Sequence, residues 1–465
     1  MKTNKLLLWI STGAFCLGSG FGQTVPGAPE TNGITPKTVT FYVNNLEDIN
    51  NGSTESLGVS IANNGNVIIG WEDDGDGVND FEAVWTLYSP SGNALITATN
   101  MHSVALSSDV TSKFLSYFRS DGSPVPGITS WGPKIKANPF GDGMGMGATS
   151  YGLGFEVPEF SATQGDDDGP DSDFPSVQLL NNNGEPLGIV SGLSDAEAQP
   201  AGGVRIGDWD YLSNGNIVIA GESRQNDDLS TKYGGAAPGK HAVYRIVTPT
   251  GQEVKAASLV SDVAEANELW HGVGVAKDGF AIRFPQNGLT MVRLFNNDGT
   301  PASTNIDLAA VTGKVAAGAG GRGDRSGFHG NGTDAYVYAT VGTDEDGLKK
   351  PWLTVLNTNG TVRFSRAIAD DIELINPGGV DAAITPDGRV LAVFDDILGA
   401  GGSFRVVFGR LFDKTGNPLG GTFYVSETET PDTVFADSES PRVAWRNELA
   451  AVIWELSRYK TAIRT

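Results

Sequence analysis

The chain has 465 residues and carries 55 acidic against 32 basic side chains, which gives a formal net charge of −23 at pH 7. This charge opposes binding to nucleic acid or to an anionic membrane by long-range attraction, and it favours solubility and the binding of cations. One cysteine excludes a disulfide-stapled domain, and 62 glycines indicate many short strands joined by tight turns.

The N-terminal residues have the pattern of a secretory signal. Lys2 and Lys5 precede an apolar run over residues 6–17, and small residues follow it. This order predicts a signal peptide over residues 1–22, and the run is too short to span a bilayer. Residues 23–37, rich in Pro, Gly and Thr, predict an exposed linker. We therefore expect a protein that is secreted, periplasmic or held on the cell surface.

Two signals alternate along residues 38–465. The first is a tight turn that leads into an apolar strand, as in NNGNVIIGW (63–71) and LSNGNIVIAGE (212–222). The second is an apolar strand that ends in a polar turn with glycine, as in VRLFNNDGT (292–300). Asn-Gly and Asp-Gly allow the positive φ of short hairpins, so both signals predict antiparallel pairs. The first signal occurs seven times, mostly at intervals of about 55 to 64 residues, if a weaker copy at 150–157 is counted.

Four-stranded units repeated seven times predict an all-β, seven-bladed β-propeller with antiparallel blades. Residues 40–43 (TFYV) repeat residues 422–425 (TFYV), so the N-terminal strand is predicted to complete the last blade. We expect the third strand of that blade at residues 460–465. Such closure removes exposed sheet edges. Residues 98–131 are interpreted as an insertion between the first and second blades; an eighth, defective blade is the alternative.

The first predicted loop between second and third strands is strongly acidic. Residues 72–80 read EDDGDGVND, which resembles the DxDxDGxxD calcium loops of thrombospondin type 3 and integrin-type propeller repeats. The resemblance implies that Glu72, Asp74, Asp76 and Asp80 supply side-chain oxygens and that Val78 supplies its carbonyl. Calcium takes six to eight oxygen ligands, so alternating acidic residues around a glycine suit it. The alternative is a solvated acidic loop without a metal.

Candidate catalytic residues follow from the expected topology. In a propeller the tight turns share one face, while the longer loops and the connections between blades share the other, where function usually resides. We expect several side chains on that face to reach the central channel: His271, His329, His241, Tyr233, Arg205 and Arg325. Such a set would suit a polysaccharide lyase, because arginine neutralises a uronate carboxylate while histidine or tyrosine transfers protons. Structural or merely exposed histidines are the alternative.

The sequence favours a ligand-binding or surface interaction module whose partner is an extracellular glycan or a cell-surface ligand. Calcium would stabilise its loops. The alternative is a polysaccharide-degrading enzyme, a lyase that acts on uronate-containing glycans. The sequence leaves open whether the protein is an enzyme, because a propeller supports many unrelated activities.

Overall fold

The computed structural model describes residues 2–7, 41–42, 55–73, 82–100, 128–152, 174–191, 204–223, 241–262, 271–312, 327–343, 347–397, 405–426 and 436–458. Almost all of these residues lie in antiparallel strands or in the turns that join them. A short helix, α3 (Leu308–Thr312), follows the outermost strand of one sheet. Within these ranges, no helix is long and apolar enough to cross a membrane.

Six sheets are complete blades, each built from four strands that are consecutive in the chain. Blade 1 comprises β3 (Glu55–Ile61), β4 (Val67–Asp73), β5 (Glu82–Tyr88) and β6 (Ala94–Asn100). Blade 2 comprises β7 (Ile128–Ala137), β8 (Met144–Gly152), β9 (Phe174–Leu180) and β10 (Pro186–Ser191). Blade 3 comprises β11 (Val204–Tyr211), β12 (Ile217–Ser223), β13 (His241–Val247) and β14 (Glu253–Leu259).

The remaining complete blades follow the same order. Blade 4 comprises β15 (Gly272–Ala276), β16 (Gly279–Gln286), β17 (Leu289–Asn296) and β18 (Ile306–Asp307). Blade 5 comprises β19 (Gly327–Gly330), β20 (Ala335–Thr343), β21 (Lys349–Asn357) and β22 (Val362–Ala367). Blade 6 comprises β23 (Val380–Ile384), β24 (Val390–Ile397), β25 (Arg405–Phe412) and β26 (Phe423–Tyr424). The predicted all-β propeller of antiparallel four-stranded blades is therefore confirmed.

A further four-stranded sheet is composite, because its strands come from both ends of the sequence. β27 (Ala436–Arg446) and β28 (Leu449–Arg458) form its inner hairpin, β1 (Lys2–Leu7) pairs with β28, and β2 (Phe41–Tyr42) is outermost. β2 thus reaches the sheet as expected, but it pairs with β1. The third-strand position that we expected residues 460–465 to fill is occupied by β1; those C-terminal residues lie outside the described part of the chain.

Blade 2 differs from its predicted position. Residues 150–152, expected to open a turn into a strand, instead end β8. The inner hairpin of this blade turns at residues 138–143, where Asn138 donates its backbone N–H to the carbonyl of Gly143. Residues 98–100 end β6 and residues 128–131 begin β7, so both ends of the expected insertion belong to blades. The sequence NPFGDG makes a longer turn than signals such as NNGN and SNGN on which the prediction depended, although it ends in Asp-Gly.

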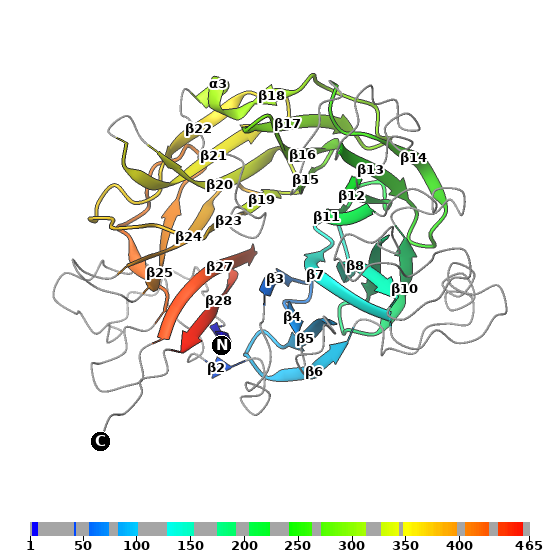
Figure 1. Cartoon of the computed structure of the whole chain (residues 1–465), viewed down its shortest axis with the longest axis horizontal. Helices are drawn as coiled ribbons and strands as arrows, with labels where there is room; N and C mark the ends of the chain where they lie inside the picture. The colour runs from blue at the N-terminus through cyan, green and yellow to red at the C-terminus, as the bar shows by residue number, and fades with distance from the viewer. Residues whose placement is uncertain are drawn as a thin grey trace, which may run out of the picture.

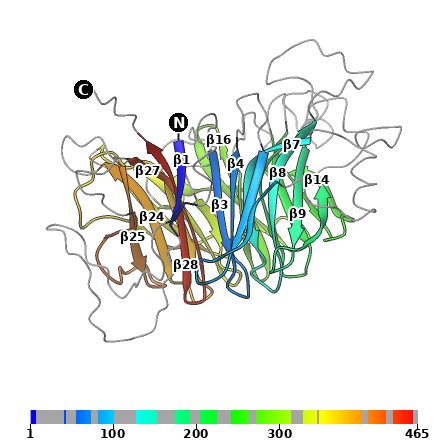
Figure 2. The same cartoon turned by 90° about the horizontal axis from the view of Figure 1, so that it is seen from below.

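The sheets follow one another around a ring, as Figure 1 shows. The first strands of the sheets are innermost, and each contacts the first strand of the next sheet: β3, β7, β11, β15, β19, β23, β27 and again β3. The side view shows these strands running between two faces of the ring (Figure 2). One face carries the turns that join first to second strands, such as residues 62–66 and 212–216. This is the hairpin face.

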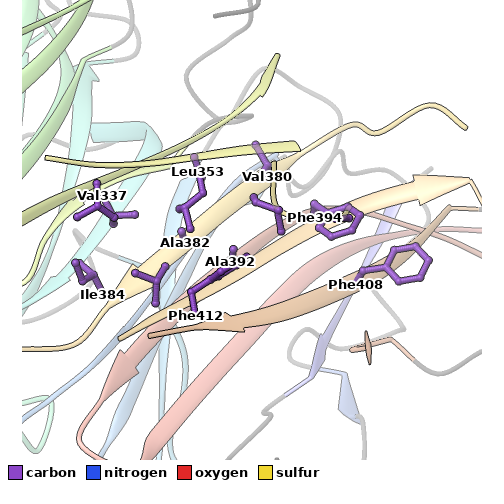
Figure 3. Packing of buried hydrophobic residues seen from close by; sticks show 14 of the residues in the cluster. Val337, Leu353, Val380, Ala382, Ile384, Ala392, Phe394, Phe408 and Phe412 are labelled. Atoms are coloured by element: carbon purple, nitrogen blue, oxygen red, sulfur yellow. The ribbon is translucent and has the colours of Figure 1, made fainter. Parts of the chain in front are cut away.

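Apolar side chains hold neighbouring blades together. Between blades 5 and 6 the side chains of Val337 and Leu353 pack with those of Ile384, Phe394 and Phe412, all of them buried (Figure 3). Such clusters recur around the ring, because the apolar side chains of the inner strands are buried between adjacent blades. Burial of a large aliphatic or aromatic side chain contributes about 1.5–3 kcal/mol, so the apolar interfaces supply most of the stability.

Candidate functional site

Charged side chains gather on the innermost strands, where a propeller would be expected to pack small or apolar groups. We call Lys136, Asp208, Asp210, His329 and Asp381 the axial cluster; they lie on β7, β11, β19 and β23. All are buried except His329, whose side chain is 35% exposed. Buried charges are costly unless they are paired, so each member must be accounted for by its contacts.

Lys136 and Asp208 join three blades. The Lys136 Nζ donates to Asp208 Oδ2 at 2.9 Å and to the carbonyl of Val273 at 3.3 Å. The same Asp208 oxygen accepts the backbone N–H of Val273 at 2.8 Å. Burial alone would lower the pKa of Lys136, but the carboxylates of Asp208 and Asp210 outweigh it and raise that pKa. The ammonium therefore stays charged and ties blade 2 to blades 3 and 4.

His329 and Asp381 repeat this arrangement on the next part of the ring. The His329 Nε2 lies 2.9 Å from Asp381 Oδ1, and Asp381 Oδ2 accepts the N–H of Val443 on β27 at 3.0 Å. Burial would raise the pKa of Asp381, but His329 outweighs it and lowers that pKa. Gly327 leaves room for this carboxylate, because a Cβ there would overlap Asp381 Oδ1. Blades 5 and 6 and the composite sheet are joined in this way.

The two arrangements occupy equivalent positions in their blades. Asp208 and Asp381 each lie four residues before the residue that starts the first hairpin turn, Leu212 and Thr385 respectively. Lys136 and His329 each lie two residues before that point, counted from Asn138 and Asn331. In both cases a basic group of one blade binds the carboxylate of the next, and that carboxylate accepts an N–H from the blade after it. We call this repeated contact the axial clasp.

Asp210 has no clasp of its own. It is buried two residues before Leu212, and its Oδ1 accepts the N–H of Tyr211 at 2.8 Å. Its Oδ2 has no partner among the described residues. Burial raises the pKa of Asp210 to about 7, although the charges of Lys136 and His329 oppose the rise. A carboxyl group that exchanges its proton near neutral pH can act as a donor or as an acceptor toward a ligand.

A second repeated contact lies nearer the opposite face. Glu72 Oε2 at the end of β4 accepts the N–H of Gly132 at 2.8 Å, and Asp395 Oδ2 on β24 accepts the N–H of Ser440 at 3.1 Å. Gly132 and Ser440 have positive φ, +66° and +54°, and each sits at a bulge of the first strand of the next sheet. Burial raises the pKa of Asp395 to about 6, and the Arg405 guanidinium beside it opposes the rise. These carboxylates therefore link neighbouring sheets through hydrogen bonds.

The Glu72 contact bears on the predicted calcium loop. Its carboxylate is buried and its Oε2 accepts the N–H of Gly132 of the next blade, so the ligand role of Glu72 in a loop over residues 72–80 stays a prediction. Asp74, Asp76, Val78 and Asp80 lie outside the described residues. Within the described ranges, no group of three or more His, Cys, Asp or Glu side chains could hold a metal ion.

The predicted catalytic histidines are not brought together. His329 lies at the hairpin-face end of β19, so the expectation that it faces the loop side is wrong. His271 lies just before β15 and packs on the preceding blade, where a Cβ on Gly207 would come within 2.6 Å of it. His241 is buried at the start of β13, the third strand of blade 3. His271 and His329 therefore turn toward opposite neighbours around the ring.

The other predicted residues are placed only in part. Arg205 lies in β11 with its backbone opposite Glu222, and Tyr233 and Arg325 lie outside the described residues. The residues that sequence reasoning missed are Lys136, Asp210 and Asp381, whereas Asp208 is a residue that the sequence already suggested near the central channel. One signal could have found Asp381: DWDYLSNG (208–215) and DAAITPDG (381–388) place an aspartate at the same distance before a hairpin turn.

No family model and no curated protein matches this sequence. Among solved structures, the chain is similar to the GH93 α-L-arabinofuranosidase of Fusarium graminearum in complex with arabinobiose, at 10% identity and a TM-score of 0.47, with 80% of this chain and 97% of that chain covered. It is similar to the polysaccharide lyase Uly1 at 13% identity and a TM-score of 0.39, with 71% and 64% covered.

A third similar structure is the β-propeller domain of the Trilobed protease from Pyrococcus furiosus, which has an open velcro topology. The identity is 9% and the TM-score 0.42, with 88% of this chain and 90% of that chain covered. At such identities and TM-scores the likeness concerns the fold alone and is not evidence for any activity.

Proposed function

We propose that this protein is a binding module for an extracellular carbohydrate, which it contacts through His329 and Asp210 on the innermost strands. The observation that carries the proposal is the state of His329. Asp381 holds its Nε2 at 2.9 Å, while the side chain remains 35% exposed. An oriented and accessible imidazole beside a carboxyl of pKa about 7 is a preorganised polar group for a ligand.

The chemistry of the axial cluster matches sugar hydroxyls. A hydroxyl group donates one hydrogen bond and accepts others, so it needs both kinds of partner. Asp210 supplies an acceptor or a donor according to its protonation, and His329 Nδ1, which has no partner among the described residues, supplies an acceptor when Nε2 carries the proton. The nearest Nε2 partner, Asp381, favours that tautomer. These groups therefore support recognition of a polyhydroxylated ligand.

The second candidate is a polysaccharide-degrading enzyme, predicted from the sequence as a lyase for uronate-containing glycans. The His329–Asp381 pair supports it, because a buried carboxylate that fixes an imidazole is a common arrangement for a general base. In that role His329 Nδ1 would remove a proton from the sugar. Tyr233, Arg205 and Arg325 remain predicted partners of this reaction.

The test of the binding proposal compares two variants. Replacing His329 with glutamine is expected to weaken carbohydrate binding at least about tenfold, the loss of one or two hydrogen bonds in a desolvated site. Isothermal titration calorimetry against a polysaccharide panel measures it, with ultraviolet absorbance of unsaturated ends followed in parallel for the lyase. Lys277→Gln, which removes an exposed cation on the hairpin face, is the control. Equal affinity of the wild type and the His329 variant would refute the proposal.

We also propose calcium in the loop over residues 72–80, bound by Asp74, Asp76, Asp80 and the Val78 carbonyl, with Glu72 retained for the contact to Gly132. Removing the ion leaves like charges close together, so EDTA is expected to lower the melting temperature by several degrees. Differential scanning calorimetry with EDTA and then with added calcium measures the shift. A D74N/D76N variant should show no EDTA effect; an unchanged shift in that variant would place the ion elsewhere.

The remaining expectations concern the number of blades and the export of the protein. We infer that the composite sheet acts as the seventh blade, because β27 contacts both β23 and β3 and so closes the ring. Export follows from the predicted signal over residues 1–22. Removal of that segment would take β1 from its place between β28 and β2. The mass of the exported chain tests the cleavage, and a chain that begins at Gln23 is the expected result.

A further inference from the structure

The charges around the axial cluster are balanced, and this limits what the site can bind. The charge of Lys136 is influenced there by three carboxylates: Asp208, Asp210 and Asp381. The cations that act on them are Lys136, Arg283 and Arg442, together with His329 when it is protonated. With His329 neutral and Asp210 ionised, the three cations match the three carboxylates, so the described residues leave no surplus positive charge for an anionic ligand.

Each cation is also engaged by contacts of its own. Lys136 binds Asp208 and the Val273 carbonyl. The Arg283 guanidinium is buried and lies 5.7 Å from the centre of the Tyr338 ring. Arg442 donates to the carbonyl of Pro441 at 2.8 Å, and its charge helps to lower the pKa of Asp381. A ligand carboxylate would have to compete with these contacts in order to recruit a cation.

Of the three carboxylates, Asp210 is the one that remains available to a ligand. It is more than nine-tenths buried, yet its Oδ2 has no partner among the described residues. Toward a hydroxyl group a carboxyl acts well in either protonation state, whereas toward a carboxylate or sulfate it repels when ionised. The whole chain, with a formal net charge of −23, adds to this repulsion at low ionic strength.

We propose that the axial cluster binds a neutral sugar and discriminates against uronates and sulfated sugars. The inference rests on the proposed function, since it names the class of carbohydrate that the same site takes. It also disfavours the uronate lyase, whose substrate needs a surplus cation beside the sugar carboxylate. Carbohydrates whose contacting residues carry only hydroxyl groups are the ligands that fit.

The effect of the Asp210 charge on ligand affinity can be estimated from Coulomb's law. A unit charge about 8 Å away, at an effective dielectric constant of about 20, changes the affinity for a singly charged group by roughly tenfold to thirtyfold. Replacing Asp210 with asparagine keeps the shape and removes that charge. We therefore expect D210N to raise the affinity for an oxidised ligand about tenfold at pH 8, and to change the affinity for its neutral parent much less.

The experiment uses matched ligands and the full chain. Neutral hexose polysaccharides are compared by calorimetry at pH 8 and low salt with the same polysaccharides oxidised at C6 to uronates. The expected result is that a neutral polysaccharide binds and that its oxidised form binds at least about tenfold more weakly. D210N should reduce this difference in affinity. Asp298→Asn, which makes the same charge change on an exposed turn of blade 4, should leave the gap unchanged.

Three other outcomes overturn different parts of the proposal. An oxidised form that binds as tightly as its neutral parent overturns the discrimination while leaving carbohydrate binding in place. Binding of neither form, to wild type or D210N, overturns the proposed function itself. A gap that Asp298→Asn narrows as much as D210N would assign the effect to net charge and would also overturn the role of Asp210.

Discussion

Replacing Asp208 with alanine is expected to lower the free energy of unfolding by about 3–5 kcal/mol, because it leaves the buried Lys136 ammonium without its carboxylate. The Val273 N–H loses its acceptor at the same time. The penalty comes mainly from the uncompensated charge. Removing that charge as well, by adding Lys136→Met, should therefore recover at least about 1–2 kcal/mol of the loss, although the double variant still lacks the clasp.

Urea denaturation of the two single variants and the double variant measures this as a double-mutant cycle. The control is the pair Arg389 and Asp387, whose atoms are 2.9 Å apart but whose side chains are 33% and 60% exposed. An exposed pair contributes about 0–1 kcal/mol, so its disruption should hardly change the free energy of unfolding. If D208A costs no more than the control, or if K136M fails to recover any of it, the axial clasp does not hold the blades together.

The architecture was largely predictable from sequence because its signals are local. Turn sequences such as SNGN (213–216) and TPDG (385–388) specify hairpins through their own backbone preferences, and they recur at a regular interval. Blade 2 was misplaced because its inner turn is longer and its second strand, MGMGATSYG (144–152), is rich in glycine. Gly147 among them is explained by the neighbouring blade: a Cβ there would come within 2.7 Å of Ile206 and of the Trp209 ring nitrogen.

The candidate site was less predictable, because its contacts join residues that are far apart in sequence. Histidines are visible as rare residues, and His329 was found for that reason. Asp381, its partner, is 52 positions away, and nothing near it in sequence indicates a pairing. Lys136 and Asp208 are separated by 72 positions. Only the circular order of the blades brings such residues together, and that order follows from packing between sheets and not from local preference.

The stability of the protein is expected to fall as the pH rises from about 4 to 7. Burial raises the pKa of Asp210 to about 7 and that of Asp395 to about 6, whereas both groups ionise near pH 4 in the unfolded chain. Between these values the folded state binds more protons than the unfolded state. The free energy of unfolding therefore decreases with increasing pH, and the decrease is complete once the pH exceeds the folded-state pKa. Asp381 acts in the opposite direction, because its pKa is lowered in the folded state. Its contribution to the free energy of unfolding increases with pH, and this change falls below pH 4.

Asparagine at position 210 removes the larger of these two contributions. A rise in pKa of about three units corresponds to a few kcal/mol, so D210N should be more stable than the wild type at pH 8 by about 2–4 kcal/mol and similar to it near pH 4. The slope that remains in D210N should level off only after the pH exceeds about 6, the pKa of Asp395 in the folded state. Urea denaturation at pH 4, 5, 6, 7 and 8 measures both chains. If D210N is the less stable protein at pH 8, the Asp210 carboxylate is needed in its ionised form, and the balance of charge at the ring axis must be different from the one described.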